Sequence, residues 1–144
     1  MTQSRSSTAS DIIAALAEPP RLAACNPLAA RFVCSLRLIA LHERAARDPV
    51  PELAARLGEV DLATRTLALA QTVASTWPEN VHVSRFCCDF LTHDEATIGA
   101  LIEAAWARDR KAFDQTLEDL IRPERIALLW DGALDLIAAE VLAS

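Results

Sequence analysis

The sequence predicts an all-α fold, a single compact bundle of six or seven helices. Alanine, which has the highest helix propensity, is very frequent, whereas tyrosine is absent and runs of β-branched residues are few. The 144 residues are 52% hydrophobic and 24% charged, with only three glycines, which is typical of a folded globular chain. A chain of this length buries a sizeable core, so we expect one helical domain at 10–144 after a flexible tail at 1–9.

Helix start and stop signals define the elements in order. Asn26 as N-cap and Pro27 at the first helical position begin the second helix, which should run to about Arg47. Its apolar residues cover a broad face, so we place it at the centre of the fold: Leu28, Phe32, Val33, Leu36, Ile39, Ala40 and Leu41. The other predicted helices are 11–18 after the N-cap Ser10, 51–57 closed by Gly58, 62–77 capped by Asp61, one that begins at Thr92, 110–121 capped by Asp109, and 123–142.

Three of these helices carry further expectations. Glu43 and Arg47 have the i,i+4 spacing of a helical ion pair. The predicted helix at 62–77 has the length to form an antiparallel pair with the central helix. Thr92 and Glu95 have the Thr-x-x-Glu spacing of a capping box, which makes this helix start the most specific in the chain.

An extended, irregular connector at about 78–92 interrupts the helical pattern. Apolar residues fall on odd positions at Val81 and Val83 but on even positions at Phe86, Cys88 and Phe90, which indicates a bend near Ser84 and Arg85. We therefore expect Cys88 to face inward with the two phenylalanines and Cys87 to face outward.

The connector also holds the best candidates for metal chemistry. Cys87 and Cys88 lie between His82 and His93, and these four side chains could bind zinc or another soft metal, with the distant Cys25 and Cys34 as further thiols. Neither the Cys-x-x-Cys nor the His-x₃-His spacing of established zinc sites occurs, and free cysteines are often simply packed as small apolar residues. The carboxylates after His93 are explained by their place in the first helical turn.

Residues 50–69 resemble a helix-turn-helix, with a short helix, Gly58 at the turn and a second helix. Glu59 follows the glycine, Thr64 stands where an apolar residue is expected, and Arg65 is the only long basic side chain on the second helix. The net charge is −6, and residues 73–144 carry thirteen acidic against six basic groups. This balance disfavours nucleic-acid binding, which needs a concentrated positive surface, so a DNA-binding regulator is our third hypothesis.

The remaining features concern location. No stretch approaches the roughly 20 apolar residues of a membrane span, and the first ten residues lack the apolar run of a secretory signal, so we expect a cytoplasmic protein with reduced thiols and no membrane contact. Thirteen arginines against one lysine, together with the alanine excess, are typical of a GC-rich bacterial genome.

No catalytic constellation or glycine-rich phosphate loop is present, so no catalytic residue is assigned. The leading hypothesis is a small non-catalytic protein that acts through a protein partner or a small ligand. The alternative is a thiol-based metal-binding or redox protein that uses Cys87 and Cys88. Because several helices are apolar on more than one face, we also expect a homodimer formed through Trp130, Ile137 and Val141 of the last helix.

Overall fold

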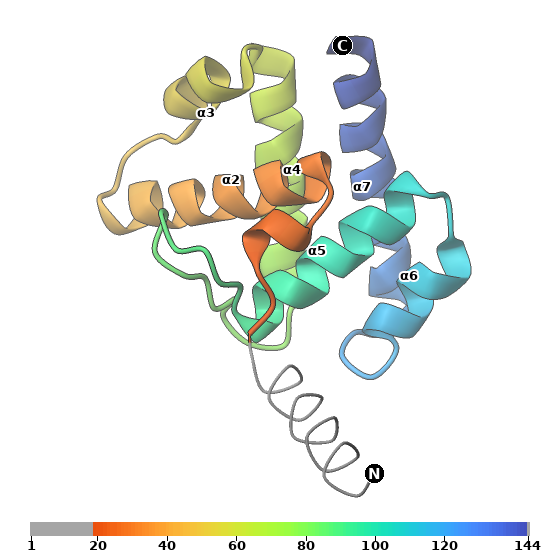
Figure 1. The fold of residues 1–144 in the computed structure, drawn as a ribbon. Coiled ribbons are helices and arrows are strands. Elements are labelled where there is room, and N and C mark those ends of the chain that lie inside the picture. Colours follow the sequence, from red (N-terminus) through yellow and green to blue (C-terminus); the bar gives the residue numbers. More distant parts are fainter. Residues whose placement is uncertain (1–18, 144) are drawn as a thin grey trace, which may run out of the picture.

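The computed structural model describes residues 19–143, and this part of the chain is a helical bundle without strands (Figure 1). The all-α prediction is confirmed. The predicted tail at 1–9 and the predicted helix at 11–18 lie outside the described residues. The elements are a short 3₁₀ turn η1 (Leu22–Ala24) and the helices α2 (Pro27–Arg44), α3 (Val50–Leu57), α4 (Val60–Thr76), α5 (His93–Trp106), α6 (Arg110–Leu117) and α7 (Pro123–Ala143).

Side-chain caps begin three of these helices as predicted. Asn26 accepts a hydrogen bond from the backbone N–H of Ala29 at 2.8 Å, and Asp109 accepts one from Ala112 at 3.0 Å. Thr92 and Glu95 form both hydrogen bonds of a capping box at the start of α5. The predicted cap at Asp61 was wrong, because α4 begins two residues before the predicted start, at Val60, and Asp61 lies in its first turn.

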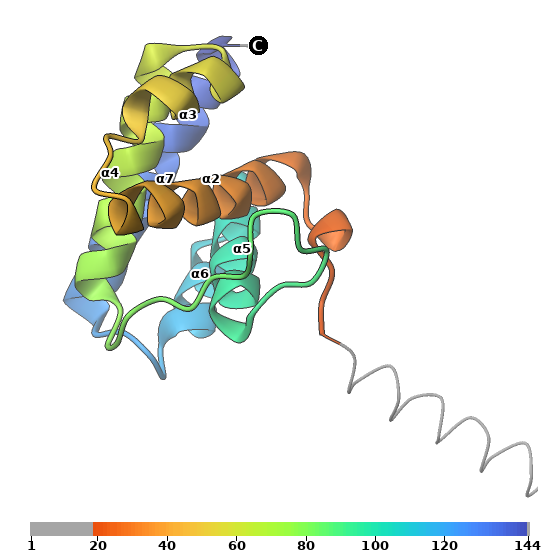
Figure 2. The same ribbon diagram turned by 90° about the vertical axis from the view of Figure 1, so that its left-hand side faces the viewer.

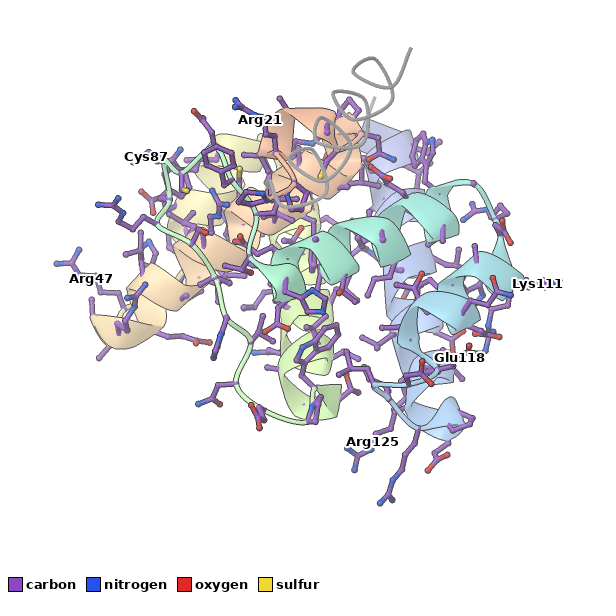
Figure 3. All side chains as sticks on the ribbon, turned by 60° about the horizontal axis from the view of Figure 1, so that its bottom comes forward. Arg21, Arg47, Cys87, Lys111, Glu118 and Arg125 are labelled. Atoms are coloured by element: carbon purple, nitrogen blue, oxygen red, sulfur yellow. The ribbon has the colours of Figure 1, made fainter. Side chains whose placement is uncertain are left out.

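Helix α2 ends at Arg44, three residues before the predicted end. Ala46 has a φ of 54°, in the left-handed region, and the chain leaves the helix there. Arg47, four positions after Glu43, therefore lies outside the helix and not one helical turn above Glu43. The described residues contain no ion pair between these two side chains. Figure 3 shows Arg47 projecting away from the body of the protein. Gly58, with a φ of 85°, ends α3 as predicted.

The most extensive packing between two helices is that of α4 against α7, which run antiparallel (Figure 1). Helix α2 instead lies across α4 and packs mainly against α5, as Figures 1 and 2 both show. The predicted antiparallel pairing of α2 with α4 was therefore wrong. Gly132 of α7 lies where the two helices approach closely, because a Cβ there would lie 3.0 Å from Leu69 Cδ1 of α4, and a larger side chain would require Leu69 to shift.

The buried apolar side chains form one cluster to which every helix from α2 to α7 contributes. On α6, Phe113 and Leu117 are fully buried, and Trp130 of α7 packs edge-on against the Phe113 ring with 5.0 Å between centroids. Among the described residues, no helix is both long enough and apolar enough to cross a membrane.

Residues 77–92 connect α4 to α5 without helix or strand, in agreement with the predicted connector (Figure 2). A turn closed by a hydrogen bond from Cys88 N–H to the Arg85 carbonyl lies close to the predicted bend. The chain before α2 runs beside the end of this connector. Two backbone hydrogen bonds of 2.8 Å join them, from Leu22 to Asp89 and from Leu91 to Pro20.

Candidate functional site

The connector is held in place by a buried ion pair between Arg37 of α2 and Glu95 of α5. The Arg37 Nε donates to Glu95 Oε2 at 2.7 Å, and Nη2 donates to Oε1 at 3.1 Å. Neither side chain has exposed surface. The planar guanidinium and carboxylate thus meet in bidentate geometry, in which a buried pair best offsets its desolvation cost. We call this pair the Arg37–Glu95 clamp.

Arg37 also binds the backbone of the connector. Its guanidinium donates to the carbonyl oxygens of Phe86, Cys88 and Phe90, at 3.3, 2.8 and 3.0 Å. The hydrogen bond to Glu95 raises the pKa of Arg37 above its ordinary value, against the opposing effect of burial. The guanidinium therefore remains charged, and it fixes three peptide groups that have no partner in a helix or sheet.

Glu95 completes the arrangement from the other side. Its carboxylate accepts hydrogen bonds from the backbone N–H groups of Ser84 at 3.2 Å and Thr92 at 2.9 Å. Burial opposes its ionisation, but Arg37 and these two N–H groups outweigh that effect and lower the pKa of Glu95. Both charges of the clamp are paired and neither side chain has exposed surface, so the clamp joins α2, α5 and the connector.

No role was predicted for Arg37 from the sequence. A signal was present, since Arg37 is the one charged residue inside the broad apolar face of the central helix, between Leu36 and Leu38. A long charged side chain at such a position is almost never buried without a partner. The capping role of Glu95 was predicted correctly, but its burial was not, because its charged partner Arg37 lies 58 positions away in the chain.

The four predicted metal ligands do not converge on one site. Cys87 is exposed on the outer surface of the connector (Figure 3), and Cys88 is half-buried, so the two thiols differ as predicted. The predicted inward position of Phe90 was wrong, because this residue is 37% exposed and its ring lies under the Arg21 guanidinium. His82 and His93 are exposed and border a different pocket, of about 500 Å³, that neither cysteine lines. Within residues 19–143, no three His, Cys, Asp or Glu side chains come together in a way that could hold a metal ion.

The remaining thiols have surroundings that disfavour reactivity. Burial raises the pKa of Cys25, and the nearby Glu103 carboxylate raises it further. Burial also raises the pKa of Cys34, although the Arg37 charge opposes this. A raised pKa leaves less thiolate at neutral pH, and thiolate is the nucleophile and the metal ligand.

A pocket of about 350 Å³, lined by aliphatic and polar residues, lies between α2, α4 and the connector. We call it the connector pocket. Buried aliphatic side chains of Leu36, Ile39, Ala70 and Val73 form its floor, and half-buried Val81 and Val83 close it from the connector side. The predicted alternation thus holds for these two valines. Three polar residues also line the pocket: Glu43, Gln71 and Asn80.

This pocket follows from how the helices cross. Because α2 lies across α4, the two helices diverge away from the crossing, and the connector covers the space between them on one side (Figure 2). The clamp determines the path of the connector and so determines the shape of the pocket. An apolar cavity with a few converging polar groups is the usual form of a small-molecule site.

The predicted interface residues differ in exposure. Ile137 is 2% exposed and belongs to the core, so it does not reach a surface where a second copy would bind. Trp130 is half-buried against Phe113, whereas Val141 is 56% exposed. The exposed apolar surface of α7 consists instead of Leu128, Val141 and Leu142.

The segment that resembles a helix-turn-helix forms α3, the turn at Gly58 and α4. Helix α4 packs mainly against α7 and α3, and its one long basic side chain, Arg65, pairs with Asp61 at 3.2 Å. DNA binding stays a prediction.

No protein family model, curated protein or solved structure matches this chain. The function proposed below therefore depends on the geometry and chemistry of the chain's own residues.

Proposed function

We propose that this is a non-catalytic binding protein that holds a small, largely apolar ligand in the connector pocket. The observation that supports it is the pocket itself, a cavity of about 350 Å³ with an aliphatic floor and three polar groups from α2, α4 and the connector. For comparison, a buried apolar cavity of ~150 Å³ holds benzene. The pocket therefore has room for a ring with a short side chain.

The proposal is tested by filling the pocket from an exposed position. Ala74 of α4 lines the pocket and is exposed, so phenylalanine there occupies the cavity without disturbing the core. Ala68 is exposed on the same helix but does not line the pocket, so Ala68→Phe is the matched control. Binding of the neutral probe 2-phenylethanol is followed by amide chemical shifts in the full chain.

The expected result is saturable shifts at Ala40, Val81 and Val83 in the wild-type protein and in Ala68→Phe, and their loss in Ala74→Phe. Shifts that do not saturate, that spread evenly over the surface, or that persist unchanged in Ala74→Phe would contradict the proposal.

A thiol-based metal-binding or redox function is the second candidate, and the exposure of Cys87 favours it because a reagent or metal can reach this thiol. Zinc titration of the reduced protein, with Cys87→Ser and Cys88→Ser as variants, tests it. Stoichiometric zinc uptake that either substitution abolishes would support this candidate. An absence of uptake, together with an ordinary alkylation rate at Cys87, would remove it.

We also propose a cytoplasmic, bacterial homodimer. The four cysteines are free thiols, which fits a reducing compartment. The exposed Val141 and Leu142 at the end of α7 provide apolar surface for a second copy. Sedimentation at micromolar concentration should give twice the 15.6 kDa chain mass, and Val141→Glu should shift it to the monomer. A monomer for the wild-type protein would contradict this.

A further inference from the structure

We propose that the connector pocket selects ligands with an apolar body and a cationic end, and that Glu43 receives the cation. This inference rests on the proposed function, since it names the class of ligand that the pocket takes. Glu43 is the only charged residue among those that line the pocket.

The Glu43 carboxylate stands in an electrostatically unfavourable place. It lies in the last turn of α2, where the carbonyl end of the helix dipole disfavours a negative charge. Among the described residues, no basic side chain pairs with it. The adjacent Arg44 donates its Nε to the Ala40 carbonyl, and Arg47 lies beyond the left-handed turn at Ala46. Among the described residues no basic side chain lines the pocket itself, although Arg44 and His82 border the adjoining hollow that Glu43 also lines, so a cationic ligand would bring a positive charge into the pocket.

The polar residues beside Glu43 support the same chemistry. Gln71 of α4 and Asn80 of the connector line the pocket with it, and both side chains are exposed. Each amide has a carbonyl oxygen that accepts hydrogen bonds, and an ammonium group has three N–H donors. One carboxylate and two amide carbonyls can therefore accept all three of these donors, while the floor contacts the apolar body.

Electrostatics also favours a cationic ligand over an anionic or a neutral one. An anion of the same shape would approach the Glu43 carboxylate and meet repulsion, in a chain whose net charge is already −6. A neutral ligand would keep the apolar contacts but gain no charge interaction. Since Glu43 is exposed, the ion pair should be worth no more than about fivefold in affinity, as for other solvated pairs.

Three probes with the same ring separate these cases: 2-phenylethylammonium, 2-phenylethanol and 3-phenylpropanoate. Their dissociation constants are measured by amide chemical shifts in the full chain, at low and at high salt. We expect the cation to bind about three- to fivefold more tightly than the alcohol, and the anion to bind most weakly. High salt should reduce the differences, because it screens exposed charges.

Glu43→Gln tests the assignment of the charge, and Glu59→Gln is the control because Glu59 is an exposed carboxylate that does not line the pocket. In Glu43→Gln, the cation and the alcohol should bind equally, whereas Glu59→Gln should keep the preference. If the cation preference survives in Glu43→Gln, the assignment is overturned. If all three probes bind the wild-type protein equally in the pocket, the inference fails while the proposed function stands. If none binds there, the proposed function itself fails.

Discussion

Replacing Arg37 with methionine should lower the free energy of unfolding by about 3–5 kcal/mol, the usual cost of removing one partner of a buried ion pair. The substitution leaves the Glu95 carboxylate, which has no exposed surface, without its counter-charge. It also removes the donor that Phe86, Cys88 and Phe90 share. For a chain of this length the melting temperature should fall by about 10–15 °C.

Urea unfolding followed by circular dichroism measures this effect, and Arg65→Met provides the control. The Arg65 side chain is 43% exposed and pairs only with the exposed Asp61 of its own helix, at 3.2 Å, so its replacement should cost less than about 1 kcal/mol. The double variant Arg37→Met/Glu95→Leu should lose less stability than the two single variants added together, because no orphaned charge remains. In the double variant, hydrogen exchange should rise first at the amides of Ser84 and Thr92, because both donate to the Glu95 carboxylate.

A loss below about 1 kcal/mol in Arg37→Met would refute this reasoning, because it would mean that the Glu95 charge is not desolvated. Strict additivity in the double variant would refute the coupling between the two side chains.

The remaining predictions concern pH and three local features. The pKa of Glu95 is lower in the folded protein, so the stabilisation by its carboxylate is complete above the ordinary glutamate pKa of about 4.3 and is lost as the pH falls toward the folded pKa. The urea midpoint of the wild-type protein should therefore drop below pH ~4.3, and that of Glu95→Gln should drop less. Thr92→Ala should cost about 1–2 kcal/mol in urea unfolding, since it removes the cap of α5. Gly132→Val should cost about 1–3 kcal/mol by pushing against Leu69, as a lowered melting temperature will show. Gly58→Ala should cost about 1–2 kcal/mol because of its positive φ, although space is open there, and calorimetry would contradict this if stability were unchanged.

The features predicted correctly depend on neighbours in the chain. The caps at Asn26, Thr92 and Asp109 each bond to an N–H three residues ahead, so the local sequence contains both partners. The bend in the connector was located from alternation over ten residues. Such signals act over one or two turns and do not depend on tertiary contacts.

The features that were missed depend on residues far apart in the chain. Arg37 and Glu95 are separated by 58 positions, and either one alone has an ordinary local explanation. The pairing of α4 with α7 depends on how closely Gly132 lets two helices approach, whereas helix propensity treats the same glycine only as a weakness. The connector pocket arises from a helix crossing that no local pattern specifies.

The separation of Arg37 and Glu95 along the sequence also affects which parts of the chain fold first. The entropy cost of closing a long loop must be met before their contact can form, so the helices can appear while the connector is still fluctuating. Val81 and Val83 then take their places only after α2 and α5 have docked. If the proposed function holds, ligand affinity should therefore report on completed folding rather than on helix formation.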